Sequence, residues 1–310
     1  IGQSTIASGV ISGLNLAEVK KYPGVTAVLT ANDIPGANDV SPLKGDDPLL
    51  AKKRIDYWGQ PIFAVVATNR RIARNACDLA IIEYDEKTPI ITIEEAVLNK
   101  SFLEPPQSIE RGNPDIELES SRNKLSGTII IGGQEHLYLE GQAAVAIPQE
   151  GKSILIYSST QHPTEIQHKV ALTLGIAYTD VTVEVCRIGG GFGGKESQGN
   201  LPACLAALTA SKTNRPSKVI YDRDDDIRIT GKRHDFKIEY SVGFDEKGKI
   251  NAIVFNHLMR CGMSWDLSEP IGDRAMLHAD NCYQIPNIRI TSTRCRTNTA
   301  SNTAFRGFGG

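Results

Sequence analysis

The chain has 310 residues, of which 40% are hydrophobic and 23% charged, a composition typical of globular proteins with a sizeable core. Its 34 basic and 36 acidic residues give a net charge of −2, so the charge balance offers no reason to expect a nucleic-acid or membrane-surface partner. The apolar runs are far shorter than a membrane span, and the length favours two domains over one.

The first hundred residues predict an α+β domain in which strands and helices alternate at short intervals. Helices are expected at 14–21 and at 69–79, where Asn69 can cap the first turn. Strands are expected at 24–30, 60–68 and 80–84, which are rich in Val, Ile and Phe or alternate in polarity. We therefore place a first domain at residues 1–100.

Residues 101–125 are predicted to be a linker. The stretch from 99 to 122 contains two consecutive prolines, Pro105 and Pro106, followed by Gly112 and Pro114. Such clusters are typical of chain that runs over the surface between domains.

A second α+β region is predicted from 126 to 310. We expect helices at 164–175 and 201–211 because apolar residues recur there at helical spacing. Strands are expected at 126–131, 153–158, 181–188, 218–221, 237–242 and 249–257, the last two joined by a hairpin turn at 245–248.

Six cysteines are present, and no two of them form a C-x-x-C pair, so the usual spacing of zinc and iron–sulfur ligands is absent. The sequence starts at Ile1 with no signal-peptide pattern, and we interpret it as part of a longer chain. Free buried thiols and a cytoplasmic location are expected on these grounds.

A glycine-rich loop, Gly189–Glu196 (GGGFGGKE), follows the strand expected at 181–188. Such a loop lets a ligand approach the backbone closely. It satisfies a bare G-x-G-x-x-G pattern, and it matches a phosphate loop until Glu196 stands where a hydroxyl is needed. A nucleotide-binding module that uses Gly189–Gly194 is therefore one hypothesis. A plain structural turn explains neither Phe192 nor the closing Lys195–Glu196 pair.

The glycine-rich loop is very similar to a signature of the molybdenum hydroxylases, above all xanthine dehydrogenase and oxidase. Three further segments resemble that family in the same order: 132–140 (GGQEHLYLE), 280–287 (DNCYQIPN) and 303–310 (TAFRGFGG). Residues 159–161 and 222–231 also match it. The resemblance implies a small α/β hammerhead domain, followed at 126–310 by the first part of the molybdopterin-binding domain, truncated at its C-terminus.

The resemblance also implies roles for single residues. Cofactor contacts fall on Gln134, Phe192, Gly193 and Arg306, of which Gln134, Phe192 and Arg306 lie nearest the metal. Substrate contacts fall on Glu196, Arg274 and Phe308. No catalytic residue is assigned, because the family's general-base glutamate is expected beyond Gly310.

The activity implied is purine hydroxylation, of xanthine or hypoxanthine, with oxygen from water and a molybdenum–molybdopterin cofactor. Iron–sulfur clusters and FAD are expected on a partner subunit or an upstream region, the rest of the molybdenum domain is an expected partner, and the complete assembly is expected to be a dimer. The chain alone is predicted to be inactive. An aldehyde-oxidising enzyme and a non-catalytic scaffold remain alternatives. The family's carbon monoxide branch carries a catalytic Cys in this loop, and no Cys lies there in this chain.

Overall fold

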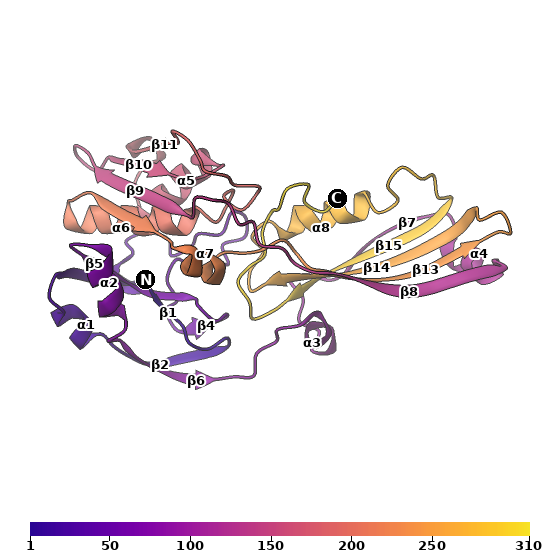
Figure 1. Cartoon of the computed structure of the whole chain (residues 1–310), viewed down its shortest axis with the longest axis horizontal. Helices are drawn as coiled ribbons and strands as arrows, with labels where there is room; N and C mark the ends of the chain where they lie inside the picture. Colours follow the sequence, from indigo (N-terminus) through magenta and orange to yellow (C-terminus); the bar gives the residue numbers. More distant parts are fainter.

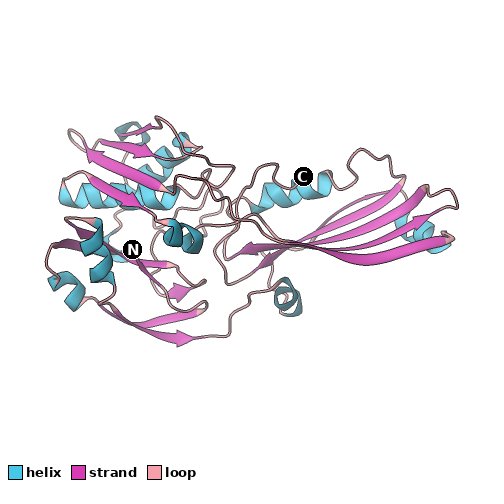
Figure 2. Ribbon diagram, in the orientation of Figure 1, coloured by secondary structure: helices cyan, strands magenta, loops and turns pink.

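The computed structural model describes all residues from Ile1 to Gly310. Figure 1 shows three parts: a first domain at the lower left, a helix-covered sheet above it, and a long sheet that extends to the right. Helices and strands are mixed in all three parts (Figure 2), which confirms the α+β prediction.

The first domain contains two small sheets of three strands each. One has the order β1–β5–β3 (Gly2–Gln3, Pro61–Ala67 and Val25–Thr30), and the other β4–β2–β6 (Arg54–Ile55, Gly9–Asn15 and Ile81–Glu86). Two helices pack on them, α1 (Ala17–Lys21) and α2 (Arg70–Cys77). The Asn69 side chain accepts a hydrogen bond from the Ile72 N–H, so it caps α2 as predicted.

The second part is a four-stranded sheet with the order β11–β10–β9–β12 (Val181–Glu184, Ile154–Ser158, Ala143–Pro148 and Ser217–Ile220). Two helices, α5 (Pro163–Leu174) and α6 (Asn200–Thr213), pack on each other and on this sheet. Pro163 starts α5 at a position that needs no amide hydrogen, and Gly175 ends it with φ 63°. The strand after α5 ends at Glu184, earlier than the predicted Ile188.

The third part is a five-stranded sheet with the order β7–β15–β14–β13–β8 (Gln107–Arg111, Asn287–Arg296, Ile250–Gly262, Phe236–Phe244 and Asn123–Ile131). β14 and β15 are parallel, so the chain must cross over between them, and α8 (Ser268–Leu277) lies in that crossover. A short helix, α7 (Arg223–Ile229), lies in the connection from β12 to β13.

The stretch predicted to be a linker has more regular structure than expected. β7 pairs with β15 at the edge of the five-stranded sheet, and α4 (Pro114–Ser120) packs against β14. Every residue of β7 is exposed, so the strand lacks the alternation of apolar and polar residues by which sequence reasoning finds strands. Helix α3 (Ile93–Leu98) packs on β14 and β15 as well. The boundaries 1–100, 101–125 and 126–310 stay a prediction.

The main core joins the first domain to the four-stranded sheet. It holds 24 buried residues, among them Leu29, Leu49 and Leu50 from the first domain and most of α6. Helix α6 is apolar on all sides from Leu201 to Ala210, which is the pattern of a helix covered on every face. All six cysteines are free, as predicted, but only Cys204, Cys261 and Cys295 are buried, whereas Cys186 and Cys282 are exposed.

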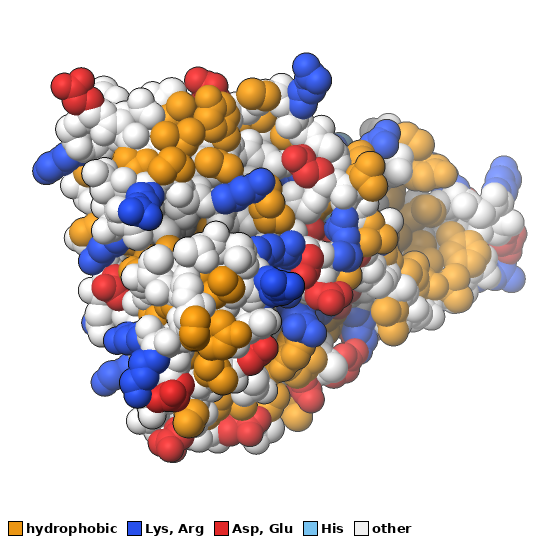
Figure 3. Space-filling view, turned by 60° about the vertical axis from the view of Figure 1, so that its left-hand side comes forward, with side chains coloured by type: hydrophobic (Ala, Val, Ile, Leu, Met, Phe, Trp, Pro, Cys, Tyr) orange, Lys and Arg blue, Asp and Glu red, His pale blue; other side chains and the backbone are white.

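No helix combines the length and the apolar composition needed to cross a membrane. In Figure 3, acidic and basic side chains are interspersed over the visible face, with apolar patches between them.

Candidate functional site

The glycine-rich loop turns sharply through backbone conformations that favour glycine. Gly190 and Gly193 have φ of 95° and 98°, and Phe192 between them has φ of 56°. A non-glycine residue in this region is uncommon and strained, and such residues cluster at functional sites. The Phe192 side chain is 49% exposed, so the strained backbone presents an aromatic ring to solvent and does not bury it.

Polar side chains from elsewhere hold the loop. The N–H groups of Gly193 and Lys195 both donate to Gln161 Oε1, at 2.9 and 3.3 Å. The Gly189 N–H donates to Glu140 Oε2 at 2.7 Å. These backbone donors are thereby satisfied inside the protein and are not left for an anionic ligand.

The Lys195 side chain points inward and is fully buried. Its Nζ donates to Ser159 Oγ at 2.7 Å and to Glu140 Oε2 at 3.2 Å, and it lies 4.6 Å from the centre of the Tyr138 ring. Burial lowers the pKa of Lys195, and the Glu140 carboxylate opposes that change. A phosphate loop needs this lysine to reach the phosphates, so the geometry does not favour the nucleotide-binding hypothesis.

The second glycine-rich segment, 303–310, lies directly against the first. A Cβ atom on Gly193 would stand 2.6 Å from the Ala304 carbonyl oxygen, so only glycine permits this approach. The Arg306 N–H donates to the Phe192 carbonyl at 2.7 Å. The structure thus brings Phe192, Gly193 and Arg306 together, and the Arg306 side chain is exposed beside them.

The 132–140 segment connects β8 of the five-stranded sheet to β9 of the four-stranded sheet, and it contacts the 303–310 segment. His136 Nε2 donates to the Ala304 carbonyl at 2.7 Å, and its ring lies 4.9 Å from the Phe305 ring. The Gln134 carbonyl accepts from the Arg233 N–H, which fixes the backbone and leaves the Gln134 amide exposed.

Arg274 and Phe308, two of the three predicted substrate contacts, lie next to each other. Arg274 lies on α8, and its guanidinium carbon is 5.1 Å from the centre of the Phe308 ring. Its Nε atom is buried and has no hydrogen-bond partner. A buried unpaired donor is costly and uncommon, which singles out Arg274 among the predicted site residues.

Glu196 ends the glycine-rich loop four residues before α6 begins. Burial raises its pKa and the nearby Glu165 raises it further, while His162 acts in the opposite direction. A raised pKa means that this carboxyl keeps its proton up to a higher pH than an ordinary glutamate does. No hydrogen bond or ion pair joins Glu196 to Arg274.

The glycine-rich loop, the 132–140 segment and the 303–310 segment thus meet one another, and three comparisons identify the architecture. A family model described as "Molybdopterin cofactor-binding domain" matches residues 97–310, and the "Aldehyde oxidase and xanthine dehydrogenase, a/b hammerhead domain" matches 1–88. The chain belongs to the molybdopterin cofactor-binding domain family. The resemblance to the xanthine dehydrogenase and oxidase family is thereby confirmed.

Relatives in this family have two kinds of name. The chain is 42% identical to "Xanthine dehydrogenase/oxidase" of Felis catus and 40% identical to "Aldehyde oxidase 2" of Cavia porcellus, covering 99% of this chain and 23% of each relative. The aldehyde oxidoreductase of Desulfovibrio gigas has the same fold, with a TM-score of 0.92 at 22% identity, covering 100% of this chain and 36% of that one. The two identities are so close that they do not separate purine from aldehyde substrates.

One of the four family motifs lies away from the other three. Residues 280–287 lead into β15 at its start, whereas 303–310 follow its end. Arg111 donates to the Ile285 carbonyl and pairs with Asp280, so this motif fastens the edge strand β7. Its place in the fold is structural.

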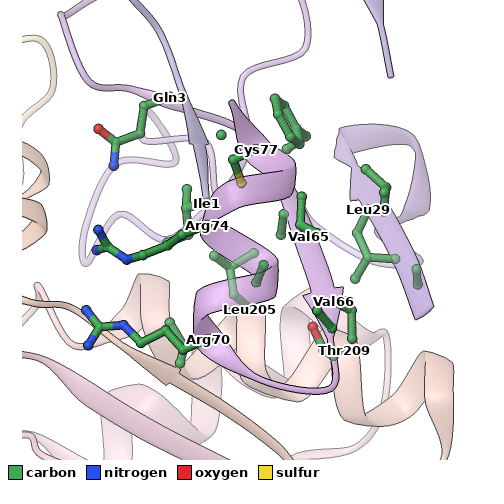
Figure 4. Close-up of a pocket in the computed structure, with 18 of the residues that line it drawn as sticks. Ile1, Gln3, Leu29, Val65, Val66, Arg70, Arg74, Cys77, Leu205 and Thr209 are labelled. Carbon is green, nitrogen blue, oxygen red and sulfur yellow. The ribbon is translucent and has the colours of Figure 1, made fainter. Parts of the chain in front are cut away.

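A wide cleft of about 1700 Å³ between the first domain and α6 contains none of the predicted site residues. Arg70 and Arg74 line it beside apolar residues such as Val65 and Leu205 (Figure 4). Both arginines pair with Asp222, and Arg74 also pairs with Asp225, so their charges are matched within the chain.

Sequence reasoning did not single out the residues that hold the glycine-rich loop. Gln161 lies in a short motif that matches the family, but its role follows only from contacts between distant segments. The inward direction of Lys195 has no signal in the sequence, because the same residue type in a glycine-rich loop is typical of phosphate binding.

Proposed function

We propose that this chain forms one wall of the cofactor and substrate site of a purine hydroxylase that resembles xanthine dehydrogenase. The observation that carries the proposal is the Arg274–Phe308 pair, in which a buried unpaired guanidinium nitrogen lies next to an aromatic ring. A flat heterocycle with acceptor atoms on its edge suits this pair, because the ring can pack on Phe308 and the edge can accept from Arg274.

The residues present also fit a molybdenum–molybdopterin cofactor. No cluster of three or more His, Cys, Asp or Glu side chains could hold a bare metal ion, so the metal would be carried by an organic ligand. Gln134, Phe192 and Arg306 would contact the cofactor, since their loops meet and their side chains are exposed. The Gly193 N–H already donates to Gln161, so it is not free to bind the cofactor. Gly193 contributes instead by letting its backbone pack closely against Ala304. When bound, the cofactor supplies the redox chemistry of the hydroxylation.

The side chains of this chain orient the substrate and stabilise charge. The Arg274 guanidinium can stabilise negative charge that develops on the heterocycle. Glu196 can form a hydrogen bond with a polar edge of the ring, which helps to orient the substrate. Phe308 fixes the plane of the ring, which limits the orientations that the reacting carbon can take.

The rest of the assembly is proposed as well. We infer that the remainder of the molybdenum domain and iron–sulfur and FAD components act with this chain in a cytoplasmic dimer. The support is that the chain covers only 23% of its named xanthine dehydrogenase relative. The chain alone is expected to be inactive, and one molybdenum per isolated chain would contradict that.

The test uses the full-length protein that contains this chain. Molybdenum is measured by mass spectrometry, and kcat/KM is compared for xanthine and for an aromatic aldehyde. The proposal expects about one molybdenum per chain and a preference for xanthine, which Arg274→Ala should reduce by about 100-fold or more, as for loss of a charge-stabilising group. Arg122→Ala is the control, because this exposed arginine pairs only with Glu246.

An aldehyde-oxidising enzyme is the second candidate, favoured by the 40% identity to an aldehyde oxidase. It predicts rapid turnover of the aldehyde, none of xanthine, and little effect of Glu196→Gln. A protein without molybdenum, made by cells that assemble the cofactor, would contradict both candidates.

A further inference from the structure

A buried carboxyl, Asp266, lies where three segments of the site converge. Its side chain is 2% exposed, and its backbone φ of 40° places it in a tight turn just before α8. The Ser197 hydroxyl donates to Asp266 Oδ1, and Ser197 Oγ lies 3.3 Å from Thr303 Oγ1. Gln198 Nε2 approaches the same oxygen at 3.5 Å.

Ser197, Thr303 and Asp266 belong to three different segments of the site. Ser197 directly follows Glu196 at the end of the glycine-rich loop. Thr303 opens the segment that carries Arg306 and Phe308. Asp266 itself stands two residues before α8, the helix that carries Arg274. The Asp266 carboxyl therefore connects the three segments that carry the predicted substrate contacts Glu196, Phe308 and Arg274.

The surroundings of Asp266 are acidic and buried. Two acidic groups, Asp47 and Glu165, interact electrostatically with Asp266, and no basic side chain forms an ion pair with it. Two tyrosines, Tyr57 and Tyr221, line a cavity of about 30 Å³ beside it, and that volume has room for a water molecule. The second carboxyl oxygen of Asp266 is buried without a hydrogen-bond partner.

Burial raises the pKa of Asp266 to about 7, with a smaller contribution from Glu165, while the hydroxyls of Ser197 and Thr303 oppose the rise. Burial also raises the pKa of Asp47, and the charge of Asp266 adds to it. A carboxyl in such a place is most stable when it is protonated, and ionising it would put an uncompensated charge among the three segments.

We propose that Asp266 is a positioning residue that holds the glycine-rich loop, the 303–308 segment and the start of α8 in one fixed arrangement. It touches neither substrate nor cofactor and acts through Ser197, Thr303 and α8. The inference rests on the proposed function only for its effect on catalysis. The expected effect on the mobility of the two segments is independent of the proposed function.

The test is amide hydrogen exchange, read by mass spectrometry, on the full-length protein and its Asp266→Ala and Asp266→Asn variants. In Asp266→Ala, exchange in 189–197 and in 303–308 should rise by about 10-fold or more, because the two segments lose their shared anchor. Asp56→Ala is the matched control, since Asp56 is also a buried carboxyl but pairs with Arg54 and Arg296 outside these segments.

Asp266→Asn keeps a polar group of the same shape that cannot ionise. The wild type should lose protection in both segments between ~pH 6 and ~pH 8, on either side of the carboxyl's pKa, while Asp266→Asn should not. In the holoenzyme, Asp266→Ala should lower kcat/KM by about 10- to 100-fold through misplaced contacts, and Asp266→Asn should flatten the pH profile.

Unchanged exchange in Asp266→Ala, or the same rise in Asp56→Ala, would overturn the proposal. A wild-type pH response retained in Asp266→Asn would overturn it also, and this variant decides the matter if Asp266→Ala does not fold. Because exchange needs neither molybdenum nor a substrate, a failure of the proposed function would appear as missing metal or turnover with the exchange pattern intact.

Discussion

The glycine-rich loop and helix α6, its neighbour in the chain, are held in place by opposite means. Polar contacts from Gln161, Glu140 and Ser159 hold the loop, and its one aromatic ring faces outward. Helix α6 is held mainly by apolar packing, since nearly all of its side chains from Leu201 to Ala210 are apolar and buried, and polar contacts lie at its ends, at Asn200 and Lys212.

The difference suggests that the stability of the fold and the positions of the site residues depend on different interactions. Apolar packing is non-directional and tolerates changes of shape, whereas a hydrogen bond fixes the position of its partners. The polar part of the molecule should therefore govern where the site residues lie and how they respond to pH. The apolar part should govern how much free energy unfolding requires.

The largest expected effect is on pH dependence near the start of α8. His234 is buried beside Ser268, and burial lowers its pKa to about 3, with a smaller contribution from the charge of Arg260. A lowered pKa means that stability present above about pH 6.5 is lost as the pH falls towards 3, by roughly 5 kcal/mol. His234→Gln should flatten this loss, measured by denaturant unfolding across pH. His278→Gln, at an exposed histidine, should leave it unchanged.

Leu208→Ala in α6 should cost about 3 kcal/mol of unfolding free energy, because it leaves a cavity in the main core. Hydrogen exchange in 189–197 should stay as in the wild type. Leu172→Ala on α5, whose side chain is 40% exposed, should cost far less. Altered loop exchange in Leu208→Ala would mean that the apolar core also sets the loop geometry.

Gly193→Ala should cost about 2–3 kcal/mol, since the new Cβ meets the Ala304 carbonyl and the backbone has a φ that suits glycine. The main result should be separation of the two glycine-rich segments, seen as faster exchange in 303–308. Gly151→Ala is the control, because Gly151 also has a positive φ of 68° but open space around it. Equal effects of the two changes would show that backbone strain alone matters.

Gln161→Ala should have the smallest effect on stability, about 1 kcal/mol, because Gln161 is itself exposed and water can enter the space that its side chain leaves and accept from the N–H groups of Gly193 and Lys195. Metal content or substrate KM of the holoenzyme should nevertheless change. Gln167→Ala is the control, because Gln167 donates to the Tyr178 and Val181 carbonyls away from the loop.

Local signals in the sequence predicted much of the fold. Asn69 marks a helix start that the structure confirms, because capping acts within one turn of the chain, and the apolar spacing that predicted a helix at 164–175 is confirmed by α5. The exposed edge strand β7 escaped prediction, since only its pairing with β15 makes it a strand.

The candidate site was predictable only in part. The family motifs indicated Phe192, Arg306, Arg274 and Phe308, and the structure brings them together in two pairs. Asp266 carries no motif. Its importance follows from contacts with Ser197 and Thr303, which are distant in the chain, and no local pattern encodes such a meeting.

The order of strands in the long sheet has a consequence for how the protein folds. β15 pairs with β7, so that Ile288 lies opposite Arg111, and the 303–310 segment leaves the end of this same strand. Contacts between residues so far apart along the chain form slowly, because a long loop must close first. The edge strand β7 and the segment that follows β15 should thus be among the last parts of the five-stranded sheet to reach their native arrangement.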